Sequence, residues 1–346
     1  MYKPLFLSFI LFAMLTACSK QESKFNSYDE ARDALYALNS SLVKSPTQSK
    51  QVDESQPIVF SDDYLKVRHL ILQSLMDMDL VQRKREQLDY LVIAERFPER
   101  FFMWPPQVNV LANMLANSNL SHNSTQIITW LKLTQDQLDL AKQSNLKLNK
   151  LERTLLLEYI SDSLAQISSK PALEEQVSIF KNYLGSYKPR SSFGLRGLPN
   201  GSQWYQSKLN YFSGIVHSPL EWVAVLNKKN KNLNPYSFNQ NLAIHHQRSF
   251  LVQFVSKEPA VLGLDWQTHY LDLPAMASSM KLSESDKTLM LAMMETDIGI
   301  HYHAWTLQQA KVNLLQKLVI TTSQAQYLVN DIILYPGQSF SFFSQL

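Results

Sequence analysis

Asp297 and His301 are the residues of this 346-residue chain whose types and spacing most directly suggest chemistry. They are four positions apart, so on a helix both side chains would lie on the same face. A carboxylate beside a histidine is the arrangement that supports a metal ligand or a catalytic base. The sequence therefore directs attention first to this pair, and then to the other histidines of the C-terminal half.

Three further histidines of that half are His245, His246 and His269. A set of His245, His269 and His301 would give zinc three ligands and leave one position for a water molecule. No local ligand spacing links the three, so we expect no cofactor and keep zinc as the alternative. In the other interpretation, hydrogen bonds satisfy the histidines where helices pack, and Asp297 holds His301 as a structural support or a minimal binding element.

Two helix starts are expected around this pair. Thr306 is followed three residues later by Gln309, and Ser323 by Gln326, which is the spacing of a capping box. Apolar residues then repeat at the helical period, and a second apolar run, residues 327–335, ends at Pro336 and Gly337.

This C-terminal stretch resembles the signature of the bacterial domain-of-unknown-function family 885, helical proteins that include many lipoproteins and resemble zinc-dependent hydrolases. The matching residues are Asp297, Gly299, Ile300, His301, Trp305, Thr306, Gln309, Ala310, Pro336, Gly337 and Gln338. The resemblance implies a helical fold related to that of a peptidase. It also implies that Trp305 and Gln338 belong to a binding region, and that His245, His246, Asp297 and His301 are remnants of a catalytic site.

The chain departs from the family where the chemistry is expected. Family members carry His-Glu-x-x-Pro-Gly-His, whose histidines bind zinc and whose glutamate activates water. When His245 and His246 are aligned on the end of that motif, Asn239 and Gln240 stand at its first His and its Glu. Leu264 stands where a later ligand-like Glu belongs. Asn and Gln keep hydrogen-bonding groups but bind zinc poorly and cannot take up a proton. We therefore expect this chain to be catalytically inactive.

Residues 185–214 are a Gly-rich element that holds five of the eight glycines. The segment from Gly194 to Gly201, followed by Trp204 and Tyr205, resembles another family element, which predicts a structured loop near a cleft. Arg196 would be its anion-binding residue, or a surface arginine on a structural turn. We take Arg196, Trp204 and Tyr205 as candidate binding residues.

Composition predicts an all-α protein, either one large multi-helix domain or two closely packed helical halves. The chain is 45% hydrophobic, has few glycines and shows no clear strand alternation. Its formal net charge of +3 gives no reason to expect a nucleic acid partner. We expect a helix from Ser27, one long helix over 62–95, and further helices over 107–117, 123–144, 148–168 and 171–184.

The N-terminus predicts a bacterial lipoprotein. Lys3 precedes an apolar stretch of signal-peptide length, too short to span a membrane. It ends in Leu-Thr-Ala-Cys, which resembles a lipobox, and Cys18 is the only cysteine. A plain signal peptide that happens to contain Cys is the alternative. Because Ser19 is not an aspartate that would retain the protein, the resemblance to enterobacterial lipoproteins favours the outer membrane and a body that faces the periplasm.

The expected organisation is a signal peptide over 1–17, a tether and short helix over 18–60, a helical half over 61–184, the Gly-rich element over 185–214, and a second helical half over 215–346. The favoured function is a lipid-anchored, catalytically inactive protein that binds an envelope protein or a peptide. A peptidase or amidase with a non-standard set of metal ligands is the alternative, and a decaying product without function is a third possibility.

Overall fold

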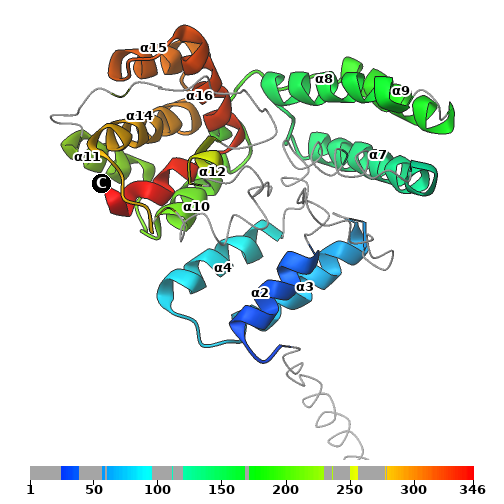
Figure 1. The fold of residues 1–346 in the computed structure, drawn as a ribbon, viewed down its shortest axis with the longest axis horizontal. Helices are drawn as coiled ribbons and strands as arrows, with labels where there is room; N and C mark the ends of the chain where they lie inside the picture. The colour runs from blue at the N-terminus through cyan, green and yellow to red at the C-terminus, as the bar shows by residue number, and fades with distance from the viewer. Residues whose placement is uncertain are drawn as a thin grey trace, which may run out of the picture.

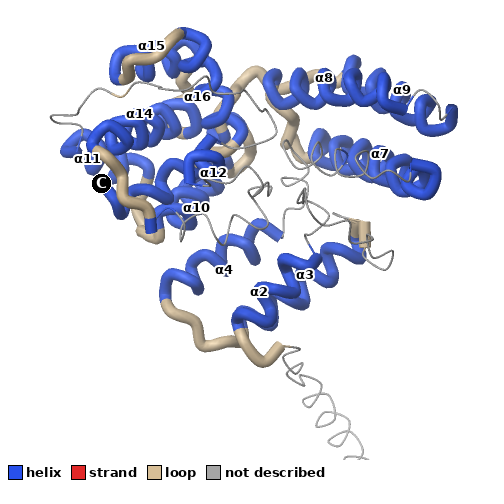
Figure 2. The backbone as a smooth tube through the Cα atoms, viewed as in Figure 1, coloured by secondary structure: helices blue, strands red, loops and turns tan. Residues whose placement is uncertain are grey.

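The all-α prediction is confirmed by the computed structural model, which describes residues 25–38, 57–58, 61–95, 111, 120–167, 171–229, 236, 250–255, 277 and 279–346. Figure 2 shows helices and loops without a strand in these residues. The helices are α2 (Tyr28–Leu38), α3 (Asp62–Met76), α4 (Gln82–Glu95), α7 (Leu120–Gln143), α8 (Lys150–Ile167), α9 (Pro171–Ser186), η2 (Leu195–Gly197), α10 (Gly201–Ser213), α11 (Pro219–Lys229), α12 (Phe250–Val255), α14 (Glu284–His301), α15 (Leu307–Lys317), α16 (Thr322–Leu334) and η4 (Gln338–Gln345).

These helices form three groups (Figure 1). Helices α2, α3 and α4 pack as one layer, and α7, α8 and α9 pack as a second group. Helices α10, α11, α12, α14, α15 and α16, with η2 and η4, form a C-terminal bundle that contacts α4 through α10. The segment 61–184, predicted as one helical half, thus contributes to two separate groups. Among the described helices, none combines the length and apolar character needed to cross a membrane.

One expected element is wrong, because the long helix predicted over 62–95 is a helical hairpin. Helix α3 ends at Met76 and α4 begins at Gln82. The Arg85 guanidinium donates to the carbonyl oxygens of Met76 and Met78, at 2.5 and 2.6 Å. Those bonds satisfy carbonyls at the end of α3 that have no partner within the helix, so Arg85 stabilises the reversal of the chain.

Helix starts are the best predicted local feature. The Thr306–Gln309 capping box is present at the start of α15. The expected start at Ser323 is wrong by two residues, because Thr321 caps α16 and pairs with Gln324. Both pairs have the same spacing and the same chemistry, so the pattern alone does not choose between them.

The Gly-rich element is less of a loop than predicted. Its second part, from Gly201 onward, is helix α10, and only the segment before it is irregular apart from the short η2 turn. Asn200 takes the left-handed conformation, with φ of 52°, and so turns the chain into α10. Arg196 lies in η2, while Trp204 and Tyr205 lie on α10.

Helix α14 is the centre of the C-terminal bundle. It contacts α11, α15, α16, η2 and η4, and nearly all its residues from Thr288 to His301 are buried. A helix that is surrounded on all sides must bury its polar residues as well as its apolar ones. Asp297 and His301 therefore lie inside the protein, and each needs partners there.

Candidate functional site

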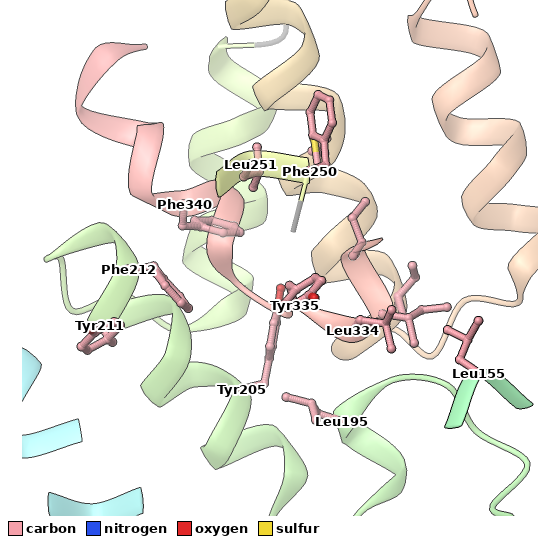
Figure 3. Packing of buried hydrophobic residues seen from close by; sticks show 14 of the residues in the cluster. Leu155, Leu195, Tyr205, Tyr211, Phe212, Phe250, Leu251, Leu334, Tyr335 and Phe340 are labelled. Atoms are coloured by element: carbon pink, nitrogen blue, oxygen red, sulfur yellow. The ribbon is translucent and has the colours of Figure 1, made fainter. Parts of the chain in front are cut away.

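Asp297 connects three parts of the bundle. Its Oδ1 accepts a hydrogen bond from the Tyr205 hydroxyl of α10 at 2.6 Å. Its Oδ2 accepts from the Gly337 backbone N–H at 2.8 Å. The Asp297 side chain is 1% exposed and Tyr205 is fully buried. In Figure 3, Tyr205 points from α10 toward Tyr335, which lies just before Gly337 in the chain.

His301 uses both ring nitrogens inside the protein. The Leu195 backbone N–H donates to Nδ1 at 3.1 Å, and Nε2 lies 2.9 Å from the Ile332 carbonyl oxygen. A carbonyl oxygen only accepts, so Nε2 carries the proton and Nδ1 is the acceptor. The Tyr205 ring lies alongside the imidazole, with centroids 5.3 Å apart. His301 is therefore a neutral imidazole in one fixed tautomer.

The expectation that Asp297 holds His301 is wrong. Each side chain has its own partners, and none of those partners is the other residue of the pair. Tyr205 links them instead, since its hydroxyl bonds Asp297 and its ring lies on His301. Helical spacing placed the two on one face correctly, but each reaches toward a different neighbouring segment.

The first residue of η2 presents the Leu195 N–H to the imidazole, directly after the loop that ends at Gly194. Gly194 allows this close approach, because a Cβ there would lie 1.9 Å from the Ile300 carbonyl oxygen. Arg190 fixes the loop by donating to the carbonyl oxygens of Phe193 and Gly194, at 3.1 and 3.0 Å. The loop geometry is thus set by the half-buried Arg190 guanidinium on one side and by the α14 backbone on the other.

Burial controls the protonation of this region. Loss of hydration raises the pKa of Asp297 to about 7, although the bonds from Tyr205 and Gly337 and the charge of Lys208 oppose the shift. Burial lowers the pKa of His301 to about 3. Between about pH 4 and 6 both residues are mainly uncharged, which suits a buried cluster.

Asp331 is a second buried carboxyl group that sequence reasoning missed. It lies on α16, is 4% exposed, and accepts a hydrogen bond at 2.7 Å from the Phe250 N–H at the start of α12. Burial, with a smaller effect of the nearby Asp297 and against the hydrogen bond from Phe250, raises the pKa of Asp331 to about 8. Its signal was available in the sequence, as a lone acidic residue within the apolar run of residues 327–335.

Lys208 is the other polar residue of this region that sequence reasoning missed. It is 6% exposed, and its ammonium group lies 5.5 Å from the Trp204 ring centroid and 5.7 Å from that of Tyr90. Such contacts let aromatic faces stabilise a cation that has left water. Nothing in the sequence distinguishes this lysine from the exposed ones, because Tyr90 comes from a distant helix.

The predicted binding residues do not share one surface. Tyr205 and Gln338 are buried. Arg196 is exposed, and its Nη1 donates to the Tyr302 carbonyl oxygen at 2.8 Å. Trp305 is half-buried, and its ring lies directly against the Gly299 backbone. Arg196 thus connects η2 to the end of α14 as a structural contact, and its role as an anion-binding residue stays a prediction.

Several predicted site residues lie outside the described residues, namely Cys18, Asn239, Gln240, His245, His246, Leu264 and His269. Zinc at His301 would need a ring nitrogen with an available lone pair. The Leu195 N–H occupies Nδ1 and Nε2 carries the proton, so His301 does not fit as a ligand. Within the described part of the chain, no group of three or more His, Cys, Asp or Glu residues is placed to hold a metal ion.

Comparison with protein-family models, with curated proteins and with solved structures finds no match to this chain. The resemblance to family 885 therefore stays a prediction from the motifs. What the geometry provides is a buried polar cluster, defined here as Tyr205, Asp297, His301 and Asp331, that ties α10, α12, α14 and the C-terminal segment together.

The buried polar cluster predicts an unusual dependence of stability on pH. Asp297 and Asp331 have folded pKa values of about 7 and 8, above an unfolded value near 4. Their contribution to the free energy of unfolding is complete below about pH 4 and is lost as the pH rises through 7 to 8. His301, with its folded pKa of about 3, makes a contribution that is complete above about pH 6.5 and is lost as the pH falls toward 3.

Between about pH 5 and 6 the folded chain holds two carboxyl protons that the unfolded chain lacks, and it lacks one imidazole proton that the unfolded chain holds. These groups should therefore lower the free energy of unfolding by roughly 1 to 1.5 kcal/mol per pH unit as the pH rises. Urea denaturation at several pH values measures the slope. Asp331→Asn keeps an acceptor for the Phe250 N–H. It should reduce by about one the number of protons that the folded chain holds in excess of the unfolded chain, and so flatten the slope. Equal slopes for the two proteins would contradict the raised pKa of Asp331.

Proposed function

We propose that this chain is a lipid-anchored protein of the bacterial periplasm that binds an envelope protein or a peptide and has no hydrolase activity. The observation that supports the lack of hydrolase activity is the hydrogen bonding of His301. Both of its ring nitrogens bond to the backbone, and it is fully buried. The family-like histidine thus holds the start of η2 against α16, and it has no nitrogen to offer to a metal or a substrate.

Asp297 supports the same interpretation. Each of its oxygens accepts from a neighbouring segment, and burial keeps the carboxyl group away from solvent. A general base must come within hydrogen-bonding distance of the proton that it removes, and no substrate could reach Asp297 without separating α10 from α14. The motif residues thus act as connections between helices.

Anchoring rests on the sequence. Cys18 follows a short apolar segment in the context of a lipobox, which supports acylation of its thiol and amino groups. One acyl chain binds a membrane only weakly, but two or more hold a protein stably. We therefore propose that the helical body faces the periplasm and stays at the membrane, with the outer membrane favoured.

Among the residues that the structure describes, an exposed candidate region for the binding role lies at the end of α14. There Arg196 is exposed, and its guanidinium lies 5.9 Å from the Tyr302 ring centroid. Its bond to the Tyr302 carbonyl uses one of five N–H groups. A peptide carboxylate is the ligand that the remaining fork would suit best.

Metal content tests the proposal directly. Purified mature protein, washed with a mild chelator and analysed by mass spectrometry of metals, should contain zinc far below one equivalent, and it should not cleave peptides. Zinc near one equivalent that is lost in His301→Gln, with the helical circular dichroism spectrum retained, would overturn the proposal. That result would favour the alternative, a hydrolase with a non-standard ligand set.

A further inference from the structure

The end of the α2–α4 layer where the N-terminal tether joins carries a small apolar surface. We define the tip as Phe25, Tyr28, Leu80, Val81 and Lys84. Helix α2 starts at Tyr28, and the connection between α3 and α4 lies at the same end of the layer, at the bottom of Figure 1. Val81 is 68% exposed, which makes it the most exposed large hydrophobic residue among those described.

Specific contacts fix the shape of the tip. The Lys84 ammonium group lies 3.8 Å from the centroid of the Tyr28 ring, which joins the start of α4 to the start of α2. Arg85 donates to the carbonyl oxygens of Met76 and Met78 and so holds the connection in one conformation. Phe25 is half-buried against the core of the layer. Val81 is thus presented outward by a rigid turn.

The sequence places the tip close to the proposed anchor. Phe25 is seven positions after Cys18, so in any conformation the two residues are at most about 25 Å apart. An acylated Cys18 lies at the bilayer surface, so the tip is the described part of the chain that is held nearest to lipid. By contrast, α15 lies at the opposite end of the molecule in Figure 1.

We propose that the tip contacts the lipid bilayer, with Val81 at the boundary between headgroups and acyl chains. This inference rests on the proposed lipid anchor and adds the orientation of the body. The residue types suit such a boundary. Aromatic rings such as Tyr28 favour the interface, and the Lys84 ammonium group over that ring suits the level of the headgroups.

The charges of the tip specify the kind of surface. Asp77 and Asp79 in the connection are exposed, and the sequence of residues 77–86 contains three acidic and three basic residues, so positive and negative charges balance. A tip without net charge has no net electrostatic attraction to anionic lipid. It therefore suits a zwitterionic surface, and its contact should depend little on salt. A contact that strengthens with anionic lipid would contradict this part of the inference.

A depth measurement on the complete lipidated protein tests the inference. Because Cys18 is the only native cysteine and its thiol is consumed by acylation, Val81→Cys provides one thiol for an environment-sensitive fluorophore. The labelled protein is reconstituted into phosphatidylcholine–phosphatidylethanolamine vesicles that contain lipids spin-labelled near the headgroup. We expect a blue-shifted emission and quenching of at least about twofold, as for side chains at the headgroup boundary.

The matched control is Val319→Cys, because Val319 is 64% exposed and follows α15 at the far end of the molecule. Its label should be neither shifted nor quenched. Neither substitution replaces a buried side chain, so both variants should fold. Vesicle flotation with an unquenched label at residue 81 would overturn the tip contact while the lipid anchor stands. Failure to float would overturn the anchor, and with it this inference.

Discussion

Asp297→Ala should destabilise the protein by about 3 kcal/mol, because it leaves two buried donors without an acceptor. Those donors are the Tyr205 hydroxyl and the Gly337 N–H, which bond the two oxygens of Asp297. Near pH 6 the carboxyl group is mostly protonated, since its pKa is about 7. The loss therefore comes from hydrogen bonding and packing, and not from an unpaired charge. Guanidinium denaturation measures the change as a shift in midpoint.

Two matched variants show whether the loss of stability in Asp297→Ala comes from the two hydrogen bonds to Asp297. Asp297→Asn should stay within about 1 kcal/mol of the parent, because its amide oxygen can accept from Gly337 while its NH₂ donates to a rotated Tyr205 hydroxyl. Asp162→Ala, at an exposed position of α8, should change stability by less than about 0.5 kcal/mol. If Asp297→Ala were as stable as Asp162→Ala, Asp297 would not connect α10 to the C-terminal segment.

Sequence reasoning found the parts of the site that are encoded locally. Helical spacing placed Asp297 and His301 on one helix, and the Thr306–Gln309 pair marked the next helix start. Such features depend on residues three or four positions apart, which contact each other whenever the segment is helical. The all-α fold followed from composition and periodicity for the same reason.

The partners of those residues could not be predicted. His301 bonds the Leu195 N–H, 106 positions away, and the Ile332 carbonyl, 31 positions away. Every residue except proline has a backbone N–H, so a backbone donor leaves no mark in the sequence. The pairing depends on which segments pack together, and that packing is a property of the whole bundle.

The prediction of one long helix over residues 62–95 was wrong for a related reason. The apolar positions of residues 62–95 suit one long helix, and they suit two antiparallel helices equally well. What favours the reversal is that Arg85 reaches back to the end of α3 and satisfies carbonyls there. In the sequence, that arginine belongs to a charge run that looks solvated on any helix.

Gly194→Ala should destabilise the protein by about 2 to 3 kcal/mol and should also release His301. The new methyl group would lie 1.9 Å from the Ile300 carbonyl oxygen and 2.9 Å from the His301 Cα. Because both contacts are to backbone, the loop before η2 must move away from α14. That movement breaks the bond from the Leu195 N–H to Nδ1, which is 3.1 Å long. Denaturation measures the first effect.

The second effect appears in the titration of the imidazole. In the parent, burial holds the pKa of His301 at about 3, and Nδ1 is already occupied by a donor. Once the loop retreats, water can reach the ring and the pKa should rise toward the ordinary value for histidine. NMR titration of the histidine ring protons follows this change. A stability loss with an unchanged His301 titration would show that the loop does not control the histidine.

Gly185→Ala is the control within the same Gly-rich element. Gly185 lies near the end of α9, and a Cβ there meets nothing within 4 Å. Alanine is the better helix former by about 1 kcal/mol at an interior position, so this variant should be as stable as the parent or slightly more stable. Opposite outcomes at these two glycines would follow from a single cause, the contact of residue 194 with α14. Equal outcomes would mean that this contact does not hold the loop in place.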